Sequence, residues 1–218
     1  MRIVVGTMTG TSMDGVDAVK VRIDGYGESM SAAFLQMESC ELGGAKKELL
    51  KLASKGGTQE EMDNAAIIVG EITATAISKL DLDTVDLIAL HGQTVYHKPP
   101  KSLQLIDPTP IVTQFPCTVL TDPRQGDLQL GGQGAPITPL ADWVMFRAVE
   151  TSTAIVNLGG FCNITLLPAN CQLNQIQGFD VCCCNLLLNA IAMERLGAEY
   201  DMNGDAALRG KVDEAICN

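Results

Sequence analysis

The first 24 residues, MRIVVGTMTGTSMDGVDAVKVRID (1–24), decide the fold class of this chain. Arg2 to Thr7 is short and rich in β-branched residues, and apolar and polar side chains alternate from Val16 to Ile23. Both patterns are typical of β-strands, and Asp24-Gly25 marks a turn before a third predicted strand from Met30 to Cys40. Because short turns join these strands, we expect an antiparallel meander.

Helical patterns follow the meander. A first helix is predicted from Ala45 to Ser54, and Gly56-Gly57 is suited to end it. Thr58 and Glu61 have the spacing of a capping box at the start of a second helix. The apolar face of that helix is made by residues spaced three or four apart: Met62, Ala65, Val69, Ile72, Ala76 and Leu80.

A buried strand is predicted next. Val85 to Leu90 is a near-continuous apolar run, which is typical of a strand buried on both faces. It ends in His91-Gly92-Gln93-Thr94, and open α/β sheets place ligands at such polar strand ends. Further short strands are expected at 104–106 and 118–120. The sequence therefore predicts an α/β fold.

A glycine-rich break at residues 131–136, GGQGAP, precedes a second series of elements. We place a domain boundary here and expect an N-terminal domain at 1–135 and the first part of a second domain at 136–218. The second series repeats the order strand, glycine turn, strand, and its last residues resemble the first turns of a helix. Its expected elements are a helix at 139–149, strands at 154–160 and 162–167, a helix at 185–196 ending at Gly197, and a helix beginning near 211.

The composition excludes several classes of function. The 218 residues include 15 Lys+Arg and 26 Asp+Glu, which gives a net charge of −11, and only 4% are aromatic. An acidic chain without a basic stripe disfavours a nucleic-acid partner. No apolar run is long enough to span a bilayer, and the N-terminus lacks the apolar region of a signal peptide. We therefore expect a cytoplasmic protein without a membrane partner.

Eight cysteines raise the question of disulfides or metal. Without a secretory signal, reduced thiols are expected. The chain has no Cys-x-x-Cys pair and only two histidines, so no metal site is expected from its cysteines. We interpret Cys182-Cys183-Cys184 as three small residues packed near a turn. The alternative is a reactive thiol at a helix N-terminus.

The turn from Gly6 to Gly15 has the composition of a phosphate-binding loop. Its glycines allow backbone N–H groups to approach an anion, its hydroxyls add donors, and Asp14 could hold a metal-bound water. An ordinary hairpin loop is the alternative, and the loop is not a Walker A motif. Gly159-Gly160 is a second turn of this kind, suited to a second phosphate contact.

Three further positions carry candidate side chains. Asp180 precedes a predicted helix and could serve as a general base, or it could be the N-cap of that helix. Arg124, between Asp122 and Asp127, could bind a carboxylate or phosphate, or these residues could form exposed ion pairs on a loop. His91, at a strand end, is either functional or a structural histidine.

Five blocks of the sequence resemble the anhydro-N-acetylmuramic acid kinase family, in the family's order along the whole chain. An ordered set of blocks is far more specific than one glycine-rich turn. The blocks are Gly6-x-Met8-Thr9-Gly10-Thr11-Ser12-x-Asp14-Gly15-Val16-Asp17; His91-Gly92-Gln93-Thr94-Val95 with His97 and Pro99; Gly131-Gly132-Gln133-Gly134-Ala135-Pro136; Asn157-Leu158-Gly159-Gly160 with Asn163-Ile164-Thr165; and Tyr200-Asp201 with Gly204 and Gly210.

The resemblance implies the fold of the sugar kinase, Hsp70 and actin superfamily. That fold has two RNase H-like domains with mixed sheets, the second incomplete in this chain, and it binds ATP in the cleft between them. The implied enzyme opens the internal 1,6-anhydro bond of anhydro-N-acetylmuramic acid with water. It phosphorylates O6 with ATP and Mg²⁺, giving N-acetylmuramic acid 6-phosphate in the recycling of cell-wall amino sugars. Family members tend to dimerise, so a homodimer is a further expectation.

The resemblance also assigns residues. The catalytic base falls on Asp180, and Asp14 would hold Mg²⁺ through a water. The positions implied for ATP are Gly10, Thr11, Ser12, Asp14, Gly15, Asp17, Gly159 and Gly160. The positions implied for the sugar are His91, Gln93, Arg124, Asp127, Gly132 and Gln133.

This chain departs from the family pattern in two respects. Val181-Cys182-Cys183-Cys184 stands where the family has Thr-Gly-Pro-Gly, which bears on substrate preference. Family members are also longer. One alternative is therefore a non-catalytic or truncated kinase-like module that binds a sugar or a protein. Another is a chaperone-type ATPase on the same fold, against which the blocks at His91 and Gly131 count.

Overall fold

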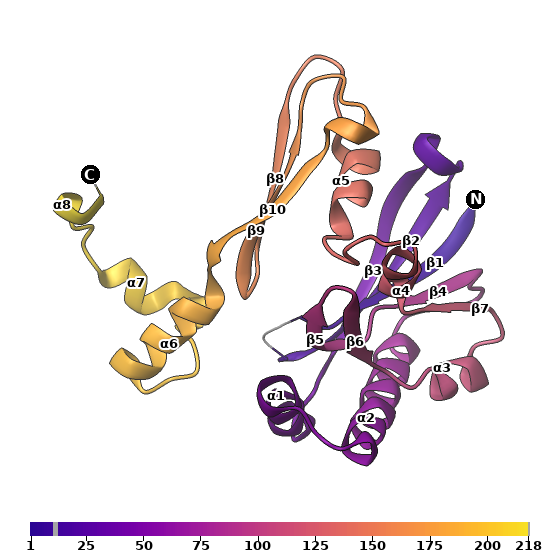
Figure 1. Cartoon of the computed structure of the whole chain (residues 1–218), viewed down its shortest axis with the longest axis horizontal. Helices are drawn as coiled ribbons and strands as arrows, with labels where there is room; N and C mark the ends of the chain where they lie inside the picture. Colours follow the sequence, from indigo (N-terminus) through magenta and orange to yellow (C-terminus); the bar gives the residue numbers. More distant parts are fainter. Residues whose placement is uncertain (11–12, 218) are drawn as a thin grey trace.

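The computed structural model describes residues 1–10 and 13–217, and the side chains up to residue 215 (Figure 1). Its main sheet has five strands in the order β3-β2-β1-β4-β7. The first three strands pair antiparallel, which confirms the predicted meander, and β4 and β7 run parallel to β1. The fold is thus mixed α/β. The strands are β1 (Arg2–Met8), β2 (Gly15–Asp24), β3 (Ser31–Glu41), β4 (Leu87–Leu90) and β7 (Thr118–Thr121).

Two predicted helices, α1 (Ala45–Lys55) and α2 (Gln59–Ser78), follow the meander. The capping box is confirmed: the Glu61 amide donates to Thr58 Oγ1 at 3.2 Å, and the Thr58 amide donates to Glu61 Oε2 at 2.8 Å. Gly56 ends α1 with φ +70°, a conformation that glycine adopts without strain. α2 lies across one face of the main sheet, in contact with β2 and β3 (Figure 1).

The main hydrophobic core lies between α2 and this sheet. Val69 and Ile77 of α2 are fully buried in one cluster with Val5 and Ile88 of the strands. Within β4, Ile88 and Leu90 are buried but Leu87 is only half-buried. β4 is therefore fully buried on one face only, where the sequence predicts burial on both.

Gly70 brings α2 against the segment that follows β6 (Lys101–Leu105). A Cβ at Gly70 would lie 2.2 Å from the Asp107 carbonyl oxygen, and the Asp107 amide donates to the Ala66 carbonyl at 2.9 Å. We expect Gly70→Ala to lower the free energy of unfolding by about 1–3 kcal/mol, because a hydrogen-bonded backbone cannot move aside freely. Chemical denaturation followed by circular dichroism measures this change.

The matched control for Gly70→Ala is Gly126→Ala on α4 (Pro123–Gln129). A Cβ there meets no atom within 4 Å, so we expect no loss of stability and a gain of about 0.5–1 kcal/mol. Equal effects at the two positions would contradict the close approach inferred at Gly70.

A small hairpin and two short helices complete this part of the molecule. β5 (Gln93–Lys98) and β6 (Lys101–Leu105) form a separate two-stranded antiparallel sheet. Residues 93–98, which follow His91 and Gly92, thus form a strand, whereas the sequence suggests only a polar strand end at this point. α3 (Thr109–Gln114) and α4 lack a predicted counterpart, because each is only about two turns long and shows no complete helical period.

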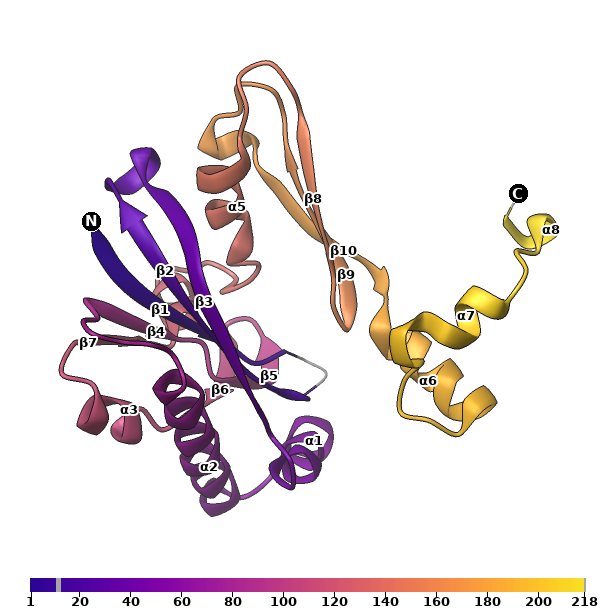
Figure 2. The same cartoon turned by 180° about the vertical axis from the view of Figure 1, so that it is seen from behind.

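Residues 138–217 form a second group of elements, in which α5 lies beside a sheet of order β10-β9-β8 and α6 to α8 lead away from one end of that sheet (Figure 2). The predicted helix at 139–149 ends earlier, because Arg147 has extended ψ. The last helix begins near the predicted position. The elements are α5 (Thr138–Phe146), β8 (Thr153–Leu158), β9 (Phe161–Leu167), β10 (Gln177–Cys183), α6 (Asn185–Leu196), α7 (Asp205–Arg209) and α8 (Glu214–Cys217), with 3-10 turns at Leu173–Gln175 and Met202–Gly204. A further 3-10 turn, Gly27–Ser29, joins β2 to β3 in the main sheet.

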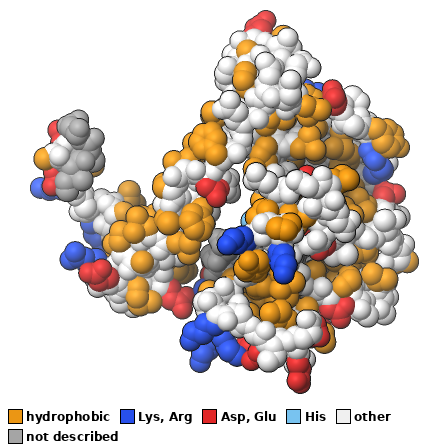
Figure 3. Space-filling model, viewed as in Figure 1, with side chains coloured by type: hydrophobic (Ala, Val, Ile, Leu, Met, Phe, Trp, Pro, Cys, Tyr) orange, Lys and Arg blue, Asp and Glu red, His pale blue; other side chains and the backbone are white. Residues whose placement is uncertain are grey.

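This second group has a small core of its own. Trp143, Leu167 and Cys171 are buried together, and Trp143 Nε1 donates to the Cys171 carbonyl at 2.8 Å. Apolar side chains over β8–β10 and α6 are largely exposed, as Figure 3 shows around α6. They include Val156, Leu158, Phe179, Val181, Leu187, Leu188, Ile191, Met193 and Leu196.

The structure places the run Cys182-Cys183-Cys184 differently from the prediction that all three residues pack near a turn. Cys182 and Cys183 lie on β10 with exposed side chains, and only Cys184 stands at the turn into α6. The seven cysteines whose side chains the structure describes all carry free thiols. In this part of the chain, no helix combines the length and the apolar character needed to cross a membrane.

Candidate functional site

Three polar residues meet at one edge of the main sheet. Thr9, His91 and Asp122 each follow the carboxyl end of a strand, β1, β4 and β7 respectively. These strands are parallel neighbours, so their carboxyl ends lie at the same edge. Open α/β sheets bind ligands at such an edge.

His91 is buried at this edge and bonded through both ring nitrogens. Its Nδ1 lies 2.8 Å from the Gly92 carbonyl oxygen, and its Nε2 lies 2.9 Å from Arg124 Nη2. A carbonyl only accepts and a guanidinium only donates. His91 is therefore neutral, with its proton on Nδ1.

The pKa of His91 is lowered from its usual 6.5, first by burial and then by the charge of Arg124. At a pH below 6.5 the unfolded chain binds this proton more readily than the folded chain. We therefore expect His91 to contribute its full stabilisation above pH 6.5 and to lose it as the pH falls through the lowered pKa. Denaturation measured from neutral pH to about pH 5 tests this.

The His91 prediction needs two comparisons. His91→Gln should flatten the pH dependence of the free energy of unfolding over this range. The unchanged chain, measured over the same pH range, gives the reference slope. A wild-type slope in the His91 variant would show that other groups cause it.

Arg124 and Asp127 of α4 clamp the glycine-rich break. Arg124 Nη1 donates to the Gly134 carbonyl at 2.8 Å, and the Gly134 amide donates to Asp127 Oδ2 at 2.7 Å. Gly132 passes so close to α4 that a Cβ would lie 2.2 Å from the Asp127 carboxylate. The predicted sugar-pocket residues of α4 and of the break are thus held in one unit, on which Gln133 is exposed.

Two buried polar atoms beside this unit have no hydrogen-bond partner among the described residues. They are Arg124 Nε and Asp122 Oδ1. Asp122 also has φ +53°, a left-handed conformation that costs free energy in a residue other than glycine. Strain and unpaired polar atoms at a strand end are typical of a ligand site.

Gln93 has a different position from the one expected of a sugar-binding residue. It is fully buried, and its Oε1 accepts from Thr9 Oγ1 at 2.6 Å. Its Nε2 donates to the carbonyls of Gly10, at 3.4 Å, and Thr94, at 3.2 Å. Its hydrogen-bonding groups are thus used to hold the end of β1 in place.

The predicted phosphate turn lies next to this edge, although Thr11 and Ser12 fall outside the described residues. Asp14 Oδ1 accepts from Lys46 Nζ of α1 at 2.7 Å, and the Asp14 side chain is 66% exposed. Lys46 also lies 3.9 Å from Glu199, which follows α6, and the Asp14 hydrogen bond raises the pKa of Lys46.

Asp14 suits the predicted magnesium contact. Mg²⁺ usually binds to one or two carboxylates, several waters and substrate phosphates. An exposed carboxylate on a glycine-rich turn fits that pattern. In the described part of the chain, no group of three His, Cys, Asp or Glu side chains could hold a metal ion by itself.

Two other residues implied for ATP make close contacts within the main sheet. Gly15 begins β2, where a Cβ would lie 2.7 Å from the Cys40 carbonyl oxygen. Asp17 Oδ1 accepts from Ser39 Oγ of β3 at 2.5 Å. Both residues support the turn from the strand side.

The Gly159-Gly160 turn packs on the start of α6. The Asn185 amide donates to the Gly159 carbonyl at 3.0 Å, and the Cys184 amide donates to the Gly160 carbonyl at 2.9 Å. The Gly159 amide donates to the Phe161 carbonyl at 3.2 Å. The Gly159-Gly160 turn therefore presents carbonyls to α6 and ties the β8–β9 hairpin to that helix.

Asp180 lies in the middle of β10, opposite Asn163 of β9, with its side chain exposed. Its interpretation as a helix N-cap is wrong, because Cys184 holds that position. On the same strand, a Cβ at Gly178 would lie 2.5 Å from Pro139 and 3.2 Å from Pro136. Residues two apart on a strand share a face, so Asp180 projects to the side of the sheet where the glycine-rich break meets α5.

The structure therefore brings some of the predicted residues together and leaves others apart. His91, Arg124, Asp127 and the 131–136 break form one hydrogen-bonded unit. Gln93 joins Gly10 to the same edge of the main sheet. Among the described residues, no hydrogen bond or ion pair joins Asp180 or the Gly159-Gly160 turn to that unit.

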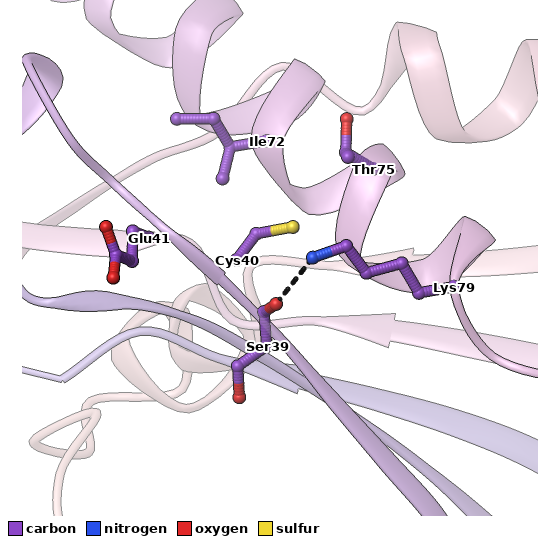
Figure 4. A pocket seen from close by; sticks show the side chains of 6 residues that line it. All are labelled: Ser39, Cys40, Glu41, Ile72, Thr75 and Lys79. Atoms are coloured by element: carbon purple, nitrogen blue, oxygen red, sulfur yellow. Dashed lines mark hydrogen bonds between the residues drawn. The ribbon is translucent and has the colours of Figure 1, made fainter.

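A separate groove of about 440 Å³ lies between β3 and α2 (Figure 4). It is lined by Ser39, Cys40, Glu41, Ile72, Thr75 and Lys79. Lys79 Nζ donates to the Ser39 carbonyl at 2.9 Å, and the adjacent Cys40 raises the pKa of Lys79. None of the residues predicted for ATP or sugar lines this groove, so it is distinct from the strand-end site.

Sequence reasoning missed Lys46 and Thr9 as partners of the site. Lys46 looks like one charge among several on an amphipathic helix, and only the fold brings it to Asp14. Thr9 lies within the predicted turn, but its bond to Gln93 spans 84 positions. No local pattern signals either contact.

Comparison with known proteins adds an independent line of information. Residues 2–218 match the family described as "Anhydro-N-acetylmuramic acid kinase". The protein of that name from Salinibacter ruber is 33% identical over 99% of this chain and 59% of its own length. Those from Caldanaerobacter subterraneus and Chromohalobacter salexigens are 31% and 33% identical, over 98% and 99% of this chain and 59% and 60% of their own lengths. The chain thus spans about three-fifths of the relatives' length.

Proposed function

The chain belongs to the anhydro-N-acetylmuramic acid kinase family, and we propose that it acts as an ATP-dependent kinase on anhydro-N-acetylmuramic acid. The reaction opens the 1,6-anhydro bond with water and phosphorylates O6. The observation that carries the proposal is the unit in which Arg124 joins His91 to Gly134, at the carboxyl edge of three parallel strands.

We propose that this unit forms one wall of the sugar pocket. Arg124 has its two terminal nitrogens bonded to His91 and Gly134, and its Nε finds no hydrogen-bond partner in the part of the chain that the structure describes. His91 fixes the plane of the guanidinium, and Asp127 fixes the Gly134 peptide. Gly132 and Gln133 then present backbone and amide groups to the sugar, while Gln93 acts indirectly by holding Thr9 and Gly10.

Asp180 is the proposed general base. Its carboxylate takes a proton from the water that attacks C1, the C1–O6 bond breaks, and O6 takes the γ-phosphoryl group. ATP supplies that phosphoryl group, and Mg²⁺ neutralises the charge of the phosphates when both are bound. Gly10, Gly15 and Asp17 shape the phosphate turn, and Asp14 would hold the magnesium through a water.

The same family membership supports a proposal for the architecture. Residues 1–135 would be one RNase H-like domain, and residues 136–218 the first part of a second. The main sheet, with its antiparallel meander followed by parallel strands, supports the first assignment. The β8–β10 sheet, with its own core, supports the second.

The test is release of ADP when the purified chain receives Mg-ATP together with anhydro-N-acetylmuramic acid. The expected result is ADP release that depends on the sugar and is absent without it. Calorimetry with the sugar and with nucleotide, each alone, separates the alternatives. Sugar binding without turnover would favour a non-catalytic module, and nucleotide hydrolysis that ignores the sugar would contradict the kinase.

A further inference from the structure

Two cysteines lie opposite each other on adjacent strands of the β8–β10 sheet. Cys182 of β10 pairs directly with Cys162 of β9 in the antiparallel register. Directly opposed residues share a face, and their Cβ atoms are about 4.5–5.5 Å apart. A disulfide needs Cα atoms about 4.4–6.8 Å apart, which opposed residues in a sheet satisfy, and Cβ atoms about 3.5–4.5 Å apart, so the two Cβ atoms would draw together slightly as the bond forms.

The environment of the two thiols differs. Cys162 on the central strand is buried, with 9% of its surface exposed, whereas Cys182 on the edge strand is exposed. The pKa of Cys162 is raised by burial and by the charges of the Cys182 and Cys184 thiols. Cys183 pairs with Phe161 instead, so it points to the opposite face.

We propose that Cys162 and Cys182 form a reversible cross-strand disulfide when the chain meets a small disulfide oxidant such as glutathione disulfide. The exposed member is accessible to the oxidant. The buried member lies directly opposite as the resolving thiol. This modification site does not depend on the proposed kinase function.

The reaction is two thiol–disulfide exchanges. The Cys182 thiolate attacks one sulfur of glutathione disulfide, forming a mixed disulfide and releasing one glutathione thiolate. The Cys162 thiolate then attacks Cys182 Sγ, and the second glutathione leaves. The two cysteine protons end on the two released glutathiones, so the chain is oxidised by two electrons and glutathione disulfide is reduced by two.

The disulfide would act next to Asp180. The register of β10 shifts between Asp180 and Cys182, which marks an irregularity in the strand at this point. A covalent bond from Cys182 to Cys162 fixes β10 to its neighbour directly after this irregularity. Oxidation would therefore fix the position of the β10 backbone next to Asp180, and with it the position of the Asp180 carboxylate.

Peptide mapping tests the proposal. The chain is treated with glutathione disulfide, its remaining thiols are blocked, and it is digested with trypsin. No Lys or Arg lies between Arg147 and Arg195, so one tryptic peptide carries five of the eight cysteines. A second cut before Asp180 separates Cys162 and Cys171 from the run at 182–184.

The expected product is a pair of peptides, 148–179 and 180–195, that stay joined until dithiothreitol is added. Cys183→Ser is the matched control and should still give the joined pair. Cys162→Ser and Cys182→Ser should each lose it, and the exposed Cys182 position decides the outcome if the buried variant does not fold. Joined peptides in the Cys182 variant, a bond within 182–184, or glutathione adducts alone would overturn the proposal.

Discussion

Asp180→Asn is expected to reduce sugar-dependent ADP release by a factor on the order of 10²–10⁴, with little change in sugar affinity. The amide keeps the size of the carboxylate but cannot take a proton from the attacking water. The residue is exposed on β10, where the backbone rather than the side chain makes the strand pairs, so the variant should fold as the unchanged chain does. Steady-state kinetics and calorimetry with the sugar measure the two quantities.

Asp83→Asn is the matched control for this substitution. Asp83 is an exposed aspartate in the connection that leads from α2 into the amino end of β4, whereas His91 follows the carboxyl end of that strand. Its variant should keep full activity. If Asp180→Asn also kept full activity, the assignment of the general base would fail while the family membership would stand.

Arg124→Ala is expected to have the largest effect on stability among the site variants, about 2–4 kcal/mol in the free energy of unfolding. The change leaves His91 Nε2 and the Gly134 carbonyl without their donor, and both residues are buried. It also removes the charge that helps to lower the pKa of His91, so that pKa should rise. Denaturation followed by circular dichroism and NMR titration of the His91 ring measure these two changes.

Arg124→Lys and Arg22→Ala sharpen this second test. An ammonium cannot reproduce the planar fork that reaches both His91 and Gly134, so the lysine variant should recover only part of the lost stability. Arg22 makes an exposed ion pair with Asp24, and its removal should change stability little. If Arg124→Ala were as mild as Arg22→Ala, the clamp on the glycine-rich break would not matter energetically.

The sequence predicts those elements whose signals are local. The capping box at Thr58 and Glu61, the apolar face of α2 and the alternating pattern of β2 each lie within one element. The short turns around Asp24 leave antiparallel pairing as the simplest arrangement. All of these agree with the structure.

The sequence predicts poorly where tertiary contacts decide. α4 is seven residues long and begins with a proline after Asp122 in a left-handed conformation, so propensity alone does not indicate a helix. β5 pairs only with β6, outside the main sheet. The sequence predicts that the cysteine run before α6 packs near a turn, yet pairing with β9 makes the run a strand as far as Cys183.

The residues of the candidate site also differ in how far the sequence predicts them. The polar strand end at His91 and the glycine turns are visible as residue types in sequence. The bond from His91 to Arg124 spans 33 positions, and the role of Gln93 depends on its complete burial. Neither distances between residues nor their burial can be read from residue types. Only the fold therefore separates the residues that bind ligand from those that hold other residues in position.

The two separate hydrophobic cores have a consequence for how this chain unfolds. The larger core lies under α2, whereas Trp143, the chain's single tryptophan, belongs to the small core beside the β8–β10 sheet. The two cores have no residue in common, so we expect them to unfold as two cooperative units, and the free energies of unfolding predicted for Gly70, His91 and Arg124 refer to the larger one. Tryptophan fluorescence reports the melting of the small unit alone, and a substitution at Arg124 or Gly70 would shift the other transition without changing that signal.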